Sequence, residues 1–173
     1  MQEEIQSLFN KITDPKEQDA YHFADKLGAI ADEEAKNKLI ELVNGEDWEV
    51  AYLACRALSK TSWNEEALDA IFEKIHDRKN KTVQGAFVQI LEEFDLSNRF
   101  VDIFRVYLFG NFKASTLAKD YLDGIEFEIT SRTIKKAEKH WNHYLHNPED
   151  LGSLEIKKLE VEPMLKEMKE LFD

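Results

Sequence analysis

The residues best suited to chemistry are three histidines in the stretch KHWNHYLHN, spaced three apart: His140, His143 and His146. On a helix, this spacing turns each imidazole by about 60° from the previous one, so neighbouring pairs could share a metal ion. A zinc site needs three or four ligands, and only Glu149 and Asp150 follow, beyond Pro148 where the helix must end. Histidines near a helix C-terminus are also favoured by the helix dipole without a metal. We therefore predict helix capping or partner contact, with a metal site as the alternative.

No other pattern in the chain supplies catalytic chemistry. The sequence holds no His-Glu-x-x-His, no glycine-rich phosphate loop and no G-x-S-x-G turn. The single cysteine, Cys55, lies in the apolar run AYLACRAL and is predicted to be a small core residue rather than a reactive thiolate. Carboxylates are abundant, but an acid–base pair needs a pocket that separates their pKa values. The sequence therefore predicts no catalytic residue, no cofactor and no enzyme.

The charge balance limits the classes of partner. Lys and Arg number 23 against 35 Asp and Glu, giving a net charge of −12. Nucleic-acid binding needs clustered cations, so this balance argues against direct nucleic-acid partners and against an anionic membrane surface. An acidic surface attracts a basic protein and speeds its arrival. The segment MQEEIQSLFN lacks the layout of a signal peptide, and no run approaches about 18 apolar residues, so a cytoplasmic protein is expected.

Two kinds of helical segment alternate along the chain. The first kind ends in Leu27, Leu58, Leu91 and Leu122, at spacings of 31, 33 and 31 residues: 20–27, 51–58, 83–91 and 114–122. A second segment follows each one: 33–43, 65–75, 99–108 and 133–145. Their apolar residues recur at i, i+3, i+4 and i+7, which is one face of a helix. The chain therefore predicts four helix pairs.

The second pair carries a family resemblance. Its sequence, EDWEVAYLACRALSKTSWNEEALDAIFEKIHD (46–77), resembles the HEAT-like repeat family, and the resemblance extends over roughly residues 14–146. The family often has a basic residue just after the Val, where this chain has Ala51, which places the usual polar ladder between repeats in question. The resemblance implies an all-α fold, a short α-α superhelix of about four helix pairs.

The remaining segments complete a single predicted domain over residues 1–173, with repeats in 14–146 and caps in 1–13 and 147–173. Residues 3–12 and 163–172 have helical apolar spacing and suit capping helices, which end repeats need. We expect a loop over 123–131 and an irregular or helical segment over 151–163.

The resemblance also implies that the second helices line a concave binding face. In the second pair, four acidic residues fall at i, i+3, i+7 and i+11 of one helix, and equivalent positions become apolar and then basic, with Lys136 and Lys139, further along the chain. The alternatives are a solvated face for the acidic residues and a buried mid-stack helix for 100–109. The candidate partner-binding residues are Glu34, Glu41, Glu66, Asp69, Glu73, Asp77, Asp102, Val106, Phe109 and His143.

Three function classes follow from this reading. The first is a non-catalytic module that binds a basic protein, for instance an immunity-type inhibitor of a nuclease toxin. The second is an enzyme on the same scaffold, by resemblance a HEAT-like alkylpurine DNA glycosylase or a bilin lyase. The third is a structural protein that assembles into homo-oligomers through its apolar third pair.

Overall fold

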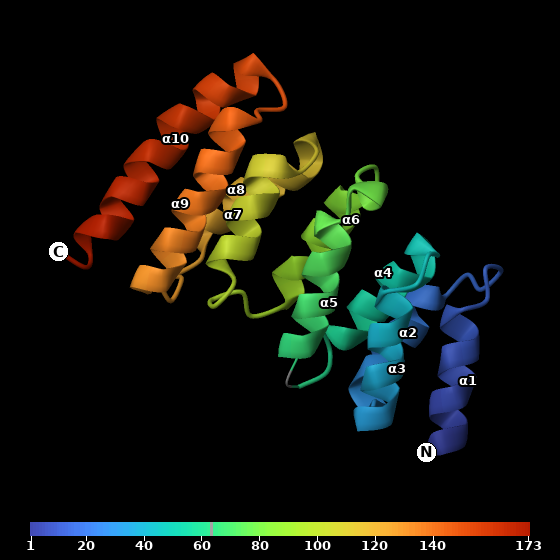
Figure 1. Ribbon diagram of the computed structural model, residues 1–173. Coiled ribbons are helices and arrows are strands. Elements are labelled where there is room, and N and C mark those ends of the chain that lie inside the picture. Colours follow the sequence, from blue (N-terminus) through green and yellow to red (C-terminus); the bar gives the residue numbers. More distant parts are fainter. Residues whose placement is uncertain (63) are drawn as a thin grey trace. The chain divides into compact units, whose positions relative to one another are not determined.

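The computed structural model describes residues 1–62 and 64–173, and these residues form helices and connecting loops without a strand. The all-α prediction is therefore confirmed. The described helices (Figure 1) are α1 (Gln2–Ile12), α2 (Ala20–Ile30), α3 (Glu33–Val43), α4 (Trp48–Leu58), α5 (Glu65–His76), α6 (Gln84–Ile90), α7 (Phe100–Phe109), α8 (Phe112–Gly124), α9 (Ser131–His146) and α10 (Leu151–Glu170), with short 3-10 turns η1 (Arg78–Asn80) and η2 (Leu91–Glu93).

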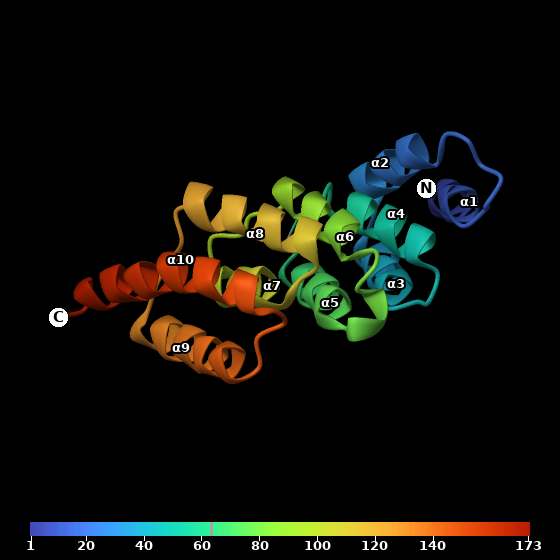
Figure 2. The same cartoon turned by 90° about the horizontal axis from the view of Figure 1, so that it is seen from above.

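The helices group into two compact units, unit 1 (Met1–Phe94) and unit 2 (Asp95–Asp173). Unit 1 has two layers. The first helices of successive pairs, α2, α4 and α6, pack side by side in one layer, and the second helices, α3 and α5, form the other (Figure 2). Helix α1 packs against α2, and its role as a cap stays a prediction. The prediction of a single domain over 1–173 stays a prediction.

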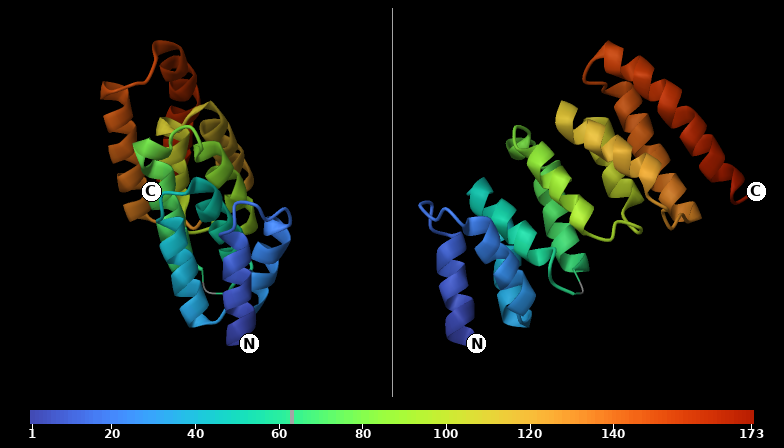
Figure 3. Two further views of the ribbon diagram at one scale, coloured as in Figure 1. Left: turned by 90° about the vertical axis from the view of Figure 1, so that its right-hand side faces the viewer. Right: turned by 180° about the vertical axis from the view of Figure 1, so that it is seen from behind.

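Unit 2 is built around α7, which packs against both α8 and α9. Helix α10 lies along α9 (Figure 3). The link between α8 and α9 is a loop, as expected, and it is anchored at its middle. The ring of Phe127 meets the ring of Phe100 edge-on at 5.3 Å, and the N–H of Glu128 donates to the carbonyl of Ser97 over 2.9 Å.

The C-terminal segment departs from its prediction. Residues 151–163 were expected to be irregular or helical and 163–172 to form a separate capping helix, but both segments belong to one helix, α10, which runs unbroken through Pro163. Asp150 caps the helix by accepting the N–H of Ser153 over 2.7 Å. Pro163 lies on the exposed side, where water can satisfy the carbonyl that a proline leaves without a donor. The opposite side buries Val161, Leu165 and Met168, and this apolar stripe keeps the helix continuous.

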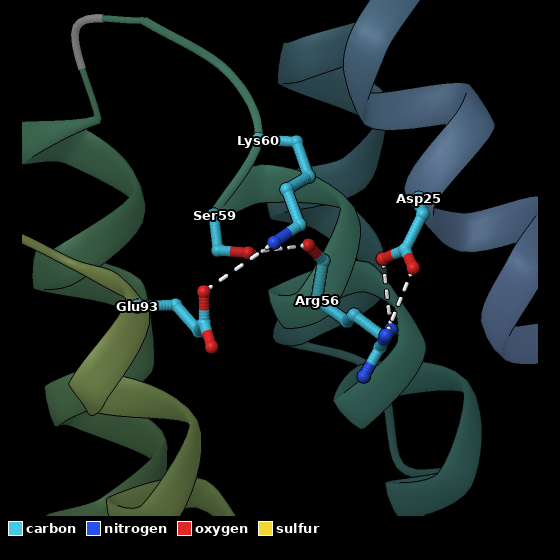
Figure 4. Close-up of polar contacts among 5 residues, drawn as sticks. All are labelled: Asp25, Arg56, Ser59, Lys60 and Glu93. Atoms are coloured by element: carbon cyan, nitrogen blue, oxygen red, sulfur yellow. Dashed lines mark hydrogen bonds and ion pairs between the residues drawn. The ribbon is translucent and has the colours of Figure 1, made fainter.

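A polar ladder joins the first helices of neighbouring pairs in unit 1. Arg56 of α4 donates from Nε and Nη2 to the two carboxylate oxygens of Asp25 on α2, both over 2.8 Å. Lys60 then reaches Glu93 over 3.3 Å (Figure 4). The partners are 31 and 33 residues apart, which is the repeat length. The ladder therefore exists without a basic residue at Ala51, which is buried, because Arg56 and Lys60 supply the cations.

Candidate partner-binding surfaces

Neighbouring helices α3 and α5 carry the predicted acidic residues of unit 1 on exposed positions. We call this surface the acidic face, and its residues are Glu34, Glu41, Glu66, Asp69 and Glu73. The two helices begin 32 residues apart, at Glu33 and Glu65, so the pairs 34/66 and 41/73 have the same phase on their helices. Because α3 and α5 pack together, these carboxylates share one side of unit 1.

Local sequence explains why carboxylates remain on this side. The apolar residues of both helices recur at helical spacing and are buried, Leu39 and Val43 on α3 and Ile71 and Ile75 on α5. The only lysine of α5, Lys74, is buried as well, and its ammonium donates to the carbonyl of Gly45. The exposed positions of α5 are consequently left to Glu and Asp.

Asp77 has a local task at the end of α5. Its side chain is exposed and accepts the N–H of Lys79 over 3.0 Å, which caps the following 3-10 turn. Asp77 therefore lies next to the acidic face and also caps the 3-10 turn that follows α5.

The candidate partner-binding residues of unit 2 do not form an exposed apolar surface. Val106 was a candidate contact, with a buried helix over 100–109 as the alternative, and the alternative holds: Val106 is 2% exposed, because α7 is hydrophobic nearly all round and packs against both α8 and α9. Phe109 is half-buried, with its ring 5.7 Å from that of His143 and 5.7 Å from that of Tyr144. Asp102 is salt-bridged to Arg99 over 3.5 Å and so belongs to a cationic neighbourhood.

The three histidines of α9 point to different places. His143 meets Phe109, and His146 bonds through Nδ1 to the carbonyl of Asn142 over 2.7 Å, within the last turn of its own helix. His140 lines a groove beside α7. Among residues 1–62 and 64–173, no three His, Cys, Asp or Glu side chains are grouped so that they could hold a metal ion.

The sequence indicated only some of the basic residues that line the groove beside His140. This groove has a volume of about 530 Å³ and lies entirely in unit 2, between the beginning of α7, the loop before α9, and α9. We call it the cationic groove; His140 lines it, and its charged side chains are Arg99, Asp102, Arg105, Glu128, Arg132, Lys136 and Lys139. The sequence indicated Lys136 and Lys139 as basic; Arg132 lies on the same helix, α9, whereas Arg105 joins them only through the packing of α7 on α9.

A smaller pocket in unit 1 was missed as well. Its volume is about 330 Å³, and it lies where the loop before α2 meets the beginning of α4. The exposed rings of Tyr21 and Trp48 line it together with carboxylates. Two of these are already engaged, because Glu17 is salt-bridged to Lys11 over 2.9 Å and Asp47 caps α4. The carboxylates of this pocket add to the negative charge of unit 1, but the pocket does not by itself indicate a ligand.

Cys55 lies in the core of unit 1, as predicted, with no exposed surface. Burial raises the pKa of its thiol well above the ordinary value, which suppresses the thiolate. We expect iodoacetamide to label Cys55 more than about a hundredfold more slowly in the folded chain than in urea, since labelling must wait for unfolding. Mass spectrometry over a time course measures both rates. Rapid labelling of the folded chain would contradict the buried placement.

Comparison with known proteins identifies the scaffold. Residues 5–92, just over half of the chain, match the family of HEAT repeats, so the chain belongs to the HEAT-repeat family. This confirms the family that the segment 46–77 indicated, although the match ends near the boundary of unit 1. No curated protein and no solved structure matches the chain. In the part of the chain that the structure describes, no helix combines the length and apolarity needed to cross a bilayer.

Proposed function

We propose that the chain is a protein-interaction module whose acidic face binds a basic surface of another protein. HEAT repeats commonly act as protein-interaction modules and are typically non-catalytic scaffolds, which supports the proposal that this chain binds another protein. The proposal that the partner is basic is carried by the alignment of exposed carboxylates on two packed helices, α3 and α5.

The energetics of like charges support a cationic partner. Glu66 and Asp69 lie three residues apart on one helix, and like charges at this spacing cost a few tenths of a kcal/mol. A basic partner offsets this repulsion, and the field of the acidic face accelerates its arrival. One specific form of the proposal is an immunity-type inhibitor that covers the cationic active site of a nuclease toxin with Glu66, Asp69 and Glu73. Charge complementarity is what supports that form.

Charge reversal on the acidic face tests the proposal. The variant Glu66→Lys/Glu73→Lys replaces two exposed carboxylates, and we expect it to lose a basic protein that the wild type captures from native lysate. With the purified partner, the variant should raise Kd at least tenfold, mainly through a slower association rate that depends on salt. Calorimetric titration and stopped-flow kinetics measure these quantities.

A matched control separates the face from the overall charge. Glu162→Lys/Glu167→Lys changes two exposed carboxylates of α10 and alters the net charge by the same amount. It should bind the partner with the wild-type Kd. If both variants bind the partner equally well, or if the captured protein is acidic, the acidic face is not the interface.

A further inference from the structure

The cationic groove of unit 2 is positively charged, whereas the chain as a whole is negatively charged. The chain carries a net charge of −12, yet five Arg and Lys side chains line this one groove against two carboxylates, Asp102 and Glu128. The cations come from different places in the sequence: Arg99 and Arg105 from the region of α7, and the others from α9. Packing of α7 against α9 therefore concentrates positive charge that the linear sequence disperses.

Most of these cations are available to a ligand. Arg99 is salt-bridged to Asp102 over 3.5 Å, which uses one cation and one of the two carboxylates. Of the five cations that line the groove, the other four form no salt bridge with a described residue: Arg105, Arg132, Lys136 and Lys139. All four are at least partly exposed. Glu128 is the only further carboxylate in the groove wall, so a surplus of positive charge remains.

The arrangement of these cations on α9 is unfavourable without a ligand. Arg132 and Lys136 are spaced at i and i+4, which places the two cations in one row along the helix. Like charges at i, i+4 destabilise a helix by about 0.2–0.5 kcal/mol per pair. Arg132 lies in the first turn of α9, where the positive end of the helix dipole adds to the repulsion. An anionic ligand would offset both effects.

We propose that the cationic groove binds a short acidic segment of a protein, with Arg105, Arg132 and Lys136 pairing its Asp and Glu side chains. The arginine guanidinium matches a carboxylate with two parallel N–H donors, so Arg105 and Arg132 give the site geometric selectivity as well as charge. The bounded volume of about 530 Å³ fits a few residues of an extended chain. A nucleic acid suits the site less well, because a long polyanion would also meet the field of a chain with net charge −12.

This site goes beyond the proposed function, since its partner chemistry is the opposite of that expected at the acidic face. A HEAT-repeat chain with both sites would hold a basic surface at unit 1 and an acidic segment at unit 2. The acidic face and the cationic groove are tested independently, because Glu66→Lys/Glu73→Lys leaves every residue of the cationic groove in place.

Fluorescence anisotropy with a labelled oligoglutamate peptide tests the groove. We expect saturable binding to the full chain that weakens as salt is added, and no binding of an oligoglutamine peptide of the same length. The variant Arg132→Glu/Lys136→Glu should raise Kd at least tenfold. The control Lys113→Glu/Lys135→Glu makes the same charge change at exposed positions outside the groove, one of them the immediate neighbour of Lys136, and should stay within about twofold of the wild type.

Three results would overturn the inference. The first is absence of saturable oligoglutamate binding. The second is equal loss of binding in the groove variant and its control, which would reduce the effect to net charge. The third is a single-stranded oligonucleotide that binds more tightly than oligoglutamate and loses binding in the groove variant, which would assign the groove to nucleic acid. Circular dichroism melts of each variant establish that the compared proteins are folded. If Glu66→Lys/Glu73→Lys binds oligoglutamate no more weakly than the wild type, the two sites are separate.

Discussion

Replacement of Gly28 by alanine is expected to destabilise unit 1 by about 3 kcal/mol, near the upper end of what overpacking costs. Gly28 is buried in α2, where this helix crosses α4. A Cβ at this position would lie 2.1 Å from the carbonyl oxygen of Ala57 and 2.9 Å from the Cβ of Lys60. The obstruction is backbone, so it cannot rotate away, and α2 must separate from α4. The Asp25–Arg56 bridge spans the same two helices and would be strained with them.

The reason for a glycine here is close approach. In a helix interior, glycine is about 1 kcal/mol less favourable than alanine, so α2 would be a better isolated helix with alanine at position 28. The native packing reverses that preference because only a residue without a Cβ lets the two backbones meet. Urea denaturation followed by far-UV circular dichroism measures the change.

Gly124→Ala is the matched control for this substitution. Gly124 ends α8, and an added Cβ there meets no atom within 4 Å. We expect this variant to be neutral or slightly more stable than the wild type, as helix propensity predicts. If Gly28→Ala were as stable as Gly124→Ala, the close packing of α2 on α4 would be refuted.

The helix pairs could be predicted from sequence because each helix buries one regular face. Leu39, Ile71 and their neighbours recur with the helical period, and the period alone places α3 and α5 within one residue of their observed bounds. The continuity of α10 could not be predicted in the same way. Pro163 ordinarily ends a helix, and its tolerance depends on its exposure to solvent, which tertiary packing decides.

The candidate sites show the same difference between what helical spacing predicts and what tertiary packing decides. The acidic face lies on two helices of equal phase, so the exposure of Glu66 and Glu73 could be predicted from spacing. The burial of Val106 could not, because a helix that is apolar all round gives no indication of which side meets solvent. Arg105 and Arg132 were missed for a related reason: their meeting depends on how α7 packs against α9, which no local pattern specifies.

Truncation of Tyr144 to alanine is expected to destabilise unit 2 by about 4 kcal/mol, the range for loss of a buried aromatic side chain. Tyr144 is 0% exposed, and its ring stacks on Trp141 with centroids 5.7 Å apart. The ammonium of Lys157 on α10 lies 5.0 Å from the same ring and donates to the carbonyl of Leu108 over 3.1 Å. Removing the ring therefore leaves a cavity beside α9 and removes the cation–π contact that the ring makes with Lys157. Urea denaturation measures the loss, and limited proteolysis of α10 should become faster.

The conservative variant Tyr144→Phe separates the ring from its hydroxyl. That hydroxyl is buried and has no hydrogen-bond partner among the described residues, and burial raises the pKa of Tyr144. An unsatisfied buried hydroxyl is unfavourable, so its removal should leave stability unchanged or raise it by up to about 1 kcal/mol. The contrast between a large loss in Tyr144→Ala and none in Tyr144→Phe would show that ring packing holds α9 and α10 together. Equal losses in the two variants would instead mean that the hydroxyl is satisfied in solution and contributes the stability, and the packing argument would fail.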